Sequence, residues 1–192
     1  GYIIATNGVE TVGDQNYNQT GSKSDPTAFN GTYLISGTGN FTSGNQSVLE
    51  GNTSITVSNG SFMQANGSLY SQLDEYNTLT VTVSDDFTVA NTTGDLGGSA
   101  ANQSFGSLTV NAGGNFTVGQ NVRSNGTAAV TAGGINVTGA TFSNAAAVTY
   151  NATGGDVQLG GLTTNNVGTA INTSGGAVTL IATNNITPGT VN

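Results

Sequence analysis

The sequence predicts an all-β fold, a single-stranded parallel β-helix, and two observations predict it. One phrase is written twice, as SLTVNAGGNFTV at Ser107–Val118 and as AAVTAGGINVT at Ala128–Thr138. In each copy, two short strands alternate apolar and polar residues on either side of Ala-Gly-Gly, a period of two that indicates half-buried strands. Thr and Val recur at alternate positions while good helix formers are scarce, which favours strands over helices.

The apolar positions of this phrase recur along the chain at intervals of about 19 to 30 residues, as expected of a solenoid repeat. Before the turn they are Ile35, Val57, Val83, Val110, Val130, Tyr150 and Leu180, and after it Phe41, Phe62, Phe87, Phe116, Ile135, Val157 and Ile186. A unit this small cannot bury its apolar face alone, so successive units stack into coils. We expect roughly seven to eight coils, rising by about 4.8 Å each.

The predicted organisation has two parts, an N-terminal strand and polar arm (1–28) and a β-helix repeat domain (29–192). Within the first, Tyr2–Ala5 predicts a strand and Glu10–Ala28 a loop or extended arm. Leu69–Glu75 is the best candidate for a single helical turn, and Thr78–Val89 is the most strand-like run.

The glycine pairs of the repeat predict tight corners with positive φ, because glycine adopts that conformation without steric cost. These pairs are Gly113-Gly114, Gly133-Gly134 and Gly154-Gly155. Asparagines at other turns predict hydrogen bonds from coil to coil, and the candidates are Asn165-Asn166 and Asn184-Asn185.

Charge and composition argue against several classes of function. The net charge is −8, and Lys23 and Arg123 are the only basic residues, so nucleic acid and anionic membrane surfaces are unsuitable partners. No run approaches the roughly 20 apolar residues of a spanning helix, so we expect no membrane insertion. The chain has no His and no Cys, and its acidic pairs are sequence neighbours that alternation sends to opposite faces. We therefore expect no enzyme.

The strongest signal beyond the fold is the Asn-X-Ser/Thr sequon, which marks N-glycosylation. Fifteen of 25 asparagines satisfy it, although Ser and Thr make up only 48 of 192 residues. Strand alternation is the alternative explanation, because it places Asn and Thr two residues apart on one face. The candidates are Asn18, Asn30, Asn40, Asn45, Asn52, Asn59, Asn66, Asn91, Asn102, Asn115, Asn125, Asn136, Asn151, Asn172 and Asn185.

Acidic residues supply one candidate cofactor, calcium, which prefers six to eight oxygen ligands. The best position is Asp85 and Asp86, with Asp74-Glu75 and Asp95 as further candidates, and Gly154-Gly155-Asp156 is a partial copy of a calcium-binding repeat. The alternative is that these carboxylates are solvated strand ends that discourage edge pairing. No other cofactor is expected.

The phrases LTVNAGGNFTV, AVTAGGINVTG and AVTLIATNNI resemble the repeats of filamentous-haemagglutinin-type secreted surface adhesins, over roughly Leu79–Ile186. The resemblance implies a right-handed parallel β-helix, a fibre shape, and adhesion to host or neighbouring cells. The Asn-Pro-Asn motifs of that family's secretion domain do not occur in this chain.

We therefore expect a non-enzymatic, extracellular cell-surface protein, a glycosylated β-helical segment of a fibre or adhesin. Its expected partners are copies of itself or flanking repeats, and glycans or proteins of a cell surface. One alternative is a mature subunit of a self-assembling filament or sheath, joined by end stacking or strand exchange. Another is a carbohydrate-binding or carbohydrate-processing β-helix. Since the chain begins at Gly1, we expect a processed subunit or an excised fragment.

Overall fold

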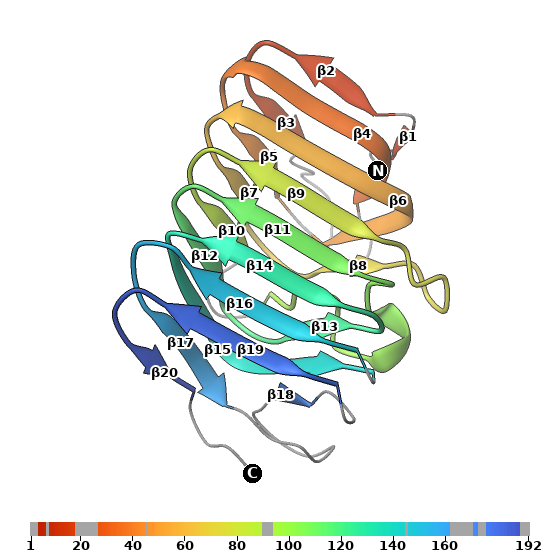
Figure 1. Ribbon diagram of the computed structural model, residues 1–192. Helices are drawn as coiled ribbons and strands as arrows, with labels where there is room; N and C mark the ends of the chain where they lie inside the picture. Colours follow the sequence, from red (N-terminus) through yellow and green to blue (C-terminus); the bar gives the residue numbers. More distant parts are fainter. Residues whose placement is uncertain are drawn as a thin grey trace.

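The computed structural model describes residues 4–6, 8–17, 27–44, 46–89, 94–144, 146–161, 171–172 and 176–188. Figure 1 shows a ribbon that winds repeatedly around one axis, with corresponding strands stacked side by side from the N-terminal to the C-terminal end. Every strand pair in the described part is parallel, and neighbours in each stack come from successive turns of the chain. The predicted parallel β-solenoid is confirmed.

The first face of the solenoid carries its longest strands. Along this face lie β2 (Val9–Thr11), β4 (Thr27–Thr38), β6 (Ser47–Asn59), β9 (Leu79–Val83), β11 (Leu108–Ala112), β14 (Ala128–Ala132), β16 (Val148–Ala152) and β19 (Val178–Ala182). In β9 the side chains alternate between buried and exposed along the whole strand, as the sequence predicts for Thr78–Val89.

The second face follows the first after a sharp corner. Its strands are β3 (Gln15–Tyr17), β5 (Phe41–Ser43), β7 (Phe62–Gln64), β10 (Phe87–Val89), β12 (Asn115–Val118), β15 (Gly134–Ser143), β17 (Val157–Gly161) and β20 (Ile186–Thr187). β20 ends immediately before Pro188, which cannot donate a ladder hydrogen bond.

A third, shorter face was not anticipated from the sequence. It consists of β1 (Ile4–Thr6), the first residues of β4 and β6, β8 (Leu69–Ser71), the bridge residue Leu96, β13 (Val122–Ser124), the end of β15, and β18 (Ile171–Asn172). Its strands pair over three residues or fewer, and the solenoid therefore has three sides instead of the two that a strand–turn–strand unit implies.

The registers place the predicted apolar positions in vertical columns. The column after the turn is confirmed along its length, since Phe41, Phe62, Phe87, Phe116, Ile135, Val157 and Ile186 are consecutive partners. The column before the turn is out of register in its first part. Val83 pairs with Ala112, and it is Val81 that pairs with Val110. A slip of two residues keeps the same side chains inside, so alternation alone cannot detect it.

The core is held together by a stack of phenylalanines. Phe41, Phe62, Phe87 and Phe116 are fully buried, and neighbouring rings lie nearly parallel with centroids 5.3, 4.7 and 5.2 Å apart. At the N-terminal end, Tyr17 packs edge-on against Phe29 at 5.1 Å. Such stacked and edge-on pairs stabilise a core beyond the area they bury.

Buried polar groups occur where the second face turns into the third. Ser43 and Ser47 share a hydrogen bond of 2.7 Å, and the Ser47 hydroxyl donates to Gln64 Oε1 at 2.8 Å. Gln64 Nε2 in turn donates to the carbonyl of Asn66 at 2.7 Å. Because the groups satisfy one another, the core tolerates them.

Two local predictions were wrong. Part of Leu69–Glu75 is strand β8, and the only helix among the described residues is a single 3-10 turn, Ala101–Gln103 (η1). Within Glu10–Ala28, Gln15–Tyr17 is a ladder strand that pairs with Phe41–Ser43. In this strand only Gln15 and Tyr17 point inward, and an alternation over three residues is too short to recognise in a sequence.

The glycine pairs also differ from expectation, because none of their six residues has positive φ. At Gly113 the corner needs glycine because the preceding turn passes too close for a side chain. A Cβ on Gly113 would overlap the carbonyl oxygen of Ser84 in the preceding turn of the chain. Positive φ occurs at other glycines, such as Gly60 and Gly67, and at Asp74 and Tyr76 after β8.

Candidate functional site

The outer edge between the first and second faces carries a ladder of polar side chains, which we call the corner ladder. Each side-chain oxygen accepts a hydrogen bond from the backbone N–H of the equivalent residue in the next turn of the solenoid. Asp14 accepts from Asn40 (2.6 Å), Asn40 from Ser61 (2.9 Å), Ser61 from Asp86 (3.2 Å) and Asp86 from Asn115 (2.7 Å). These bonds satisfy N–H groups at a corner where the sheet ladder is interrupted.

The corner ladder gives Asp86 a structural partner, since its Oδ1 already accepts a hydrogen bond from Asn115. Asp85 lies beside it, and the Ser84 hydroxyl is 3.4 Å from its Oδ1. In the part of the chain that the structure describes, no three Asp, Glu, His or Cys side chains gather closely enough to hold a metal ion. The predicted calcium site at Asp85 and Asp86 therefore has no third carboxylate near it.

A second ladder runs along the corner between the second and third faces, and it includes Asp95. The backbone N–H of Asp95 donates to Ser68 Oγ at 3.1 Å. Asp95 Oδ1 accepts from the backbone and side-chain nitrogens of Asn121, at 3.1 and 2.8 Å, and Asn121 Oδ1 accepts from the backbone of Ala140 at 2.9 Å. Asp95, a calcium candidate from the sequence, is buried, and its carboxylate bonds one turn of the solenoid to the next.

Of the predicted Asn contacts, Asn184-Asn185 lies in the described part. The backbone N–H of Asn185 donates to Asp156 Oδ1 at 2.9 Å, and its side chain donates to the same oxygen at 3.2 Å. Asn165-Asn166 lies outside the described residues. Asparagine therefore bonds from coil to coil at Asn185 as predicted, and it also does so at Asn40, Asn52 and Asn121, which sequence reasoning did not single out for this role.

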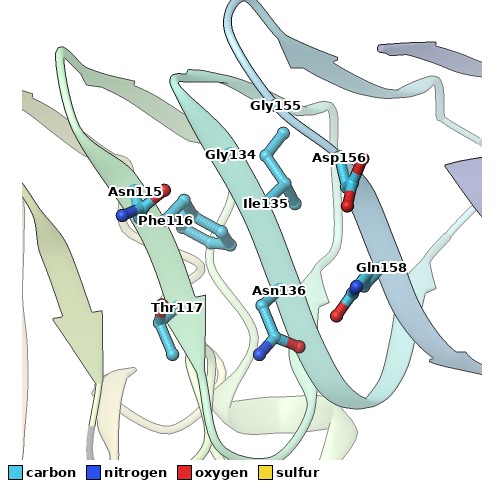
Figure 2. Close-up of a pocket in the computed structure, with 9 residues that line it drawn as sticks. All are labelled: Asn115, Phe116, Thr117, Gly134, Ile135, Asn136, Gly155, Asp156 and Gln158. Atoms are coloured by element: carbon cyan, nitrogen blue, oxygen red, sulfur yellow. The ribbon is translucent and has the colours of Figure 1, made fainter. Parts of the chain in front are cut away.

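The second face bears a shallow hollow of about 310 Å³ over β12, β15 and β17. Figure 2 shows its outward side chains Asn115, Thr117, Asn136, Asp156 and Gln158. Asp156 is its only ionisable group, and the other side chains offer amides and a hydroxyl. The hollow can therefore form hydrogen bonds with a polar ligand or carry an attached polar group, and it lacks a pair of groups for acid–base chemistry.

The structure separates the sequon asparagines by exposure. Seven are exposed, namely Asn40, Asn52, Asn59, Asn66, Asn115, Asn136 and Asn185, and four are half-buried, namely Asn30, Asn102, Asn125 and Asn151. Asn18, Asn45, Asn91 and the side chain of Asn172 lie outside the described residues. Exposure matters because a glycan needs room around the amide nitrogen.

The exposed sequons differ further in whether the side-chain nitrogen is occupied. Nδ2 of Asn59 donates to Thr38 Oγ1 at 2.7 Å, and Nδ2 of Asn66 donates to the carbonyl of Gly44 at 2.9 Å. Asn115 and Asn136 donate no side-chain hydrogen bond within the described part of the chain.

Comparisons of the chain with protein family models, with curated proteins and with solved structures gave no match. No described helix has the length and apolar character needed to cross a bilayer.

Proposed function

We propose that this chain is a non-enzymatic structural segment of an extracellular surface fibre or adhesin, with N-linked glycans on the faces of a parallel β-solenoid. The observation that carries the proposal is the group of exposed sequons, of which Asn115 and Asn136 have unoccupied side-chain nitrogens. Both stand over the hollow in Figure 2, on neighbouring turns of the second face.

The charge distribution supports the same proposal. Only 12 of 192 residues are charged, so the surface presents mainly hydroxyls, amides and backbone. Glycans would supply solubility that charged side chains normally supply. The side-chain ladders bond successive turns of the solenoid together without forming a reactive group, which suits a spacer or display element.

Intact-mass measurement on protein purified from its natural source tests the glycan proposal. Enzymatic removal of N-linked glycans should lower the measured mass, in steps of one glycan. Asn136→Gln and Thr138→Ala both destroy the sequon at Asn136, so each variant should lack the mass of one glycan. Asn111→Gln, at an exposed asparagine outside any sequon, is the matched control. An unglycosylated mass would reject the proposal of glycan display.

A second candidate is a filament subunit joined end to end, and the last described strands favour it. Val178 and Ile186 continue columns whose preceding members, Val148 and Val157, are fully buried, yet they are 43% and 45% exposed. Burying them against another copy would remove apolar surface from water. Sedimentation and electron microscopy should then show filaments that Val178→Asp disperses, and a parent protein that stays monomeric at high concentration would exclude this candidate.

A further inference from the structure

Arg123 is the only basic residue among those the structure describes, and its surroundings differ from the rest of the surface. It lies on β13 of the third face, where its register partner on β15 is Phe142. The guanidinium carbon stands over the Phe142 ring, 3.8 Å from its centre. This cation–π contact holds the guanidinium in one orientation.

The guanidinium is incompletely satisfied in this position. Its Nε is buried and has no hydrogen-bond partner among the described residues. Burial lowers the pKa of Arg123, and the nearby Asp95 carboxylate opposes that effect. Asp95 Oδ1 already accepts two hydrogen bonds from Asn121. The Asp95 carboxylate therefore stabilises the positive charge of Arg123 without accepting hydrogen bonds from the guanidinium. A guanidinium whose donors lack partners suits a carboxylate ligand, which can accept two parallel hydrogen bonds from it.

A hollow of about 320 Å³ lies over this cation, at the lower end of the size range of small-molecule sites. Its lining comes from separate segments of the chain and includes Tyr76, Ser104, Asn125 and Asn144. The segments are tied together, since the backbone N–H of Asp74 donates to the Asn102 carbonyl at 2.9 Å. Asn144 Nδ2 donates to Asn125 Oδ1 at 3.0 Å, which fixes both amides at the rim.

We propose that this hollow binds an acidic sugar, a uronate-type residue whose carboxylate pairs with Arg123 while its ring hydroxyls meet the amides of Asn125 and Asn144. Charge complementarity selects the carboxylate, because the guanidinium presents donors in a planar fork. Amides and hydroxyls around the cation suit the several hydroxyls of a sugar ring. A peptide adding as a strand is disfavoured, because β13 already pairs with β15 on one side and with Leu96 and Phe105 on the other.

This inference goes beyond the proposed display of glycans and can fail separately from it, since it concerns a ligand that the chain binds and not one that it carries. Asn125 links the two, because its sequon lies in the wall of the hollow. A glycan attached to Asn125 in the natural protein would fill the site, and site-resolved mass spectrometry that finds one would overturn the inference while leaving the proposed function intact.

The binding test is an NMR titration of the full chain with D-glucuronate and D-galacturonate, beside D-glucose and D-galactose. We expect a uronate to bind at least about tenfold more tightly than its neutral counterpart, with shifts at the amides of Ser124 and Asn125, because a hydrogen bond to a charged group is lost with the carboxylate. Arg123→Gln should abolish the preference, and Arg123→Lys should weaken it because a point charge lacks the fork.

Two further variants separate binding from folding. Phe142→Leu keeps the charge but removes the ring under the guanidinium, and it should weaken uronate binding severalfold. Gln158→Ala, in the hollow of the second face, should leave uronate binding unchanged. Equal binding of uronate and neutral sugar, an Arg123→Gln variant that folds and retains the preference, acetate binding as tightly as uronate, or a triglutamate peptide binding more tightly than a triuronide would each overturn the acidic-sugar assignment.

Discussion

The first and second halves of the solenoid bury the same column with different side chains. On the second face, four phenylalanines from Phe41 to Phe116 stack ring on ring, whereas the following buried partners are the aliphatic Ile135 and Val157. The outer corner changes at the same place. The corner ladder runs without a gap from Asp14 to Asn115, and the next position is Gly134, which has no side chain.

The difference shows that two kinds of stack can hold successive turns together. The first half has an aromatic stack inside and a hydrogen-bonded ladder outside, both running parallel to the solenoid axis. The second half keeps one such ladder bond, from the Asn185 N–H to Asp156, and otherwise relies on backbone pairing and aliphatic contacts. The ring of Tyr150 lies 6.5 Å from that of Phe116 between their centroids. Stability in a solenoid is close to a sum over neighbouring turns, so the halves should differ in local stability.

The largest expected effect comes from interrupting the aromatic stack. Phe87→Ala should lower the free energy of unfolding by about 4 kcal/mol, because it removes a fully buried ring with neighbours on both sides. Ile135→Ala, in the same column of the second half, should cost about 3 kcal/mol. Denaturant unfolding followed by circular dichroism measures both changes.

A double-mutant cycle sharpens this comparison beyond the area lost. Phe62 and Phe87 should show a coupling energy of about 1 kcal/mol from ring stacking. Ile135 and Val157 lack that geometry and should couple more weakly. Equal coupling in the two pairs would show that the phenylalanine stack contributes only buried area.

The sequence was sufficient for the fold class and for one column, and the reason is physical. Phenylalanine is rare in this chain and marks one position per turn, so the register of Phe41 to Phe116 could be read directly. Small β-branched residues are common, and a slip of two residues changes nothing in an alternating pattern. For this reason the sequence aligned the column of Ile35, Val57 and Val83 with Val110. In the structure the next partner in that column, after Val83, is Ala112.

The third face and the corner ladder were beyond sequence reasoning for different reasons. The third face has strands of at most three residues, and several of its inward side chains are Ser or Thr, such as Ser71 and Thr141, so no apolar period marks it. The corner ladder uses Asp and Asn at turns, where turn formation, metal binding and glycosylation explain those residues equally well. Only the register shows that Asp86 faces the backbone of Asn115.

Buried tyrosines in both halves predict a loss of stability at alkaline pH. Burial raises the pKa of Tyr17 from 10 to about 12, and it raises the pKa of Tyr150, whose hydroxyl shares a 2.7 Å hydrogen bond with Thr141. Below about pH 10 both folded and unfolded states hold the proton. Above it the unfolded state loses the proton first, so the unfolding free energy falls by about 1.4 kcal/mol per pH unit for each such tyrosine.

Phenylalanine variants show how much of this alkaline fall in unfolding free energy comes from the tyrosine of each half. Tyr17→Phe should make the unfolding free energy fall less steeply with pH up to about pH 12, which gives the contribution of the first half. Tyr150→Phe should do the same for the second half. Tyr150→Phe also costs about 1 kcal/mol at neutral pH, because Thr141 loses its partner. Urea unfolding across the alkaline range measures the slope, and a slope that neither variant changes would contradict the assignment.

The corner ladder should contribute less than the aromatic stack. Asp86→Ala removes the acceptor of the Asn115 N–H and should cost about 1 kcal/mol. Asp86→Asn keeps an oxygen acceptor, as Asn40 does toward Ser61 in the same ladder, and should cost less. Faster hydrogen exchange at the Asn115 amide in Asp86→Ala, with little change in Asp86→Asn, is the expected pattern. Equal effects would mean that the charge and not the acceptor is what matters.

The smallest expected effect comes from extending the corner ladder across its gap. A Cβ on Gly134 meets only the movable tip of Asn115, whose Oδ1 would lie 2.8 Å away, with the next atoms at 3.9 Å. Gly134→Asn should therefore stabilise the chain by about 0.5–1 kcal/mol, because it restricts the unfolded backbone and offers an acceptor to the following turn. Gly134→Ala shares the first effect and lacks the second, so the difference between the two variants isolates the ladder bond. Gly113→Ala, at a corner where the Cβ would overlap the Ser84 carbonyl oxygen, should instead destabilise by about 2 kcal/mol. If Gly134→Asn is no more stable than Gly134→Ala, the gap at Gly134 has no energetic consequence, and the two halves differ only in their core.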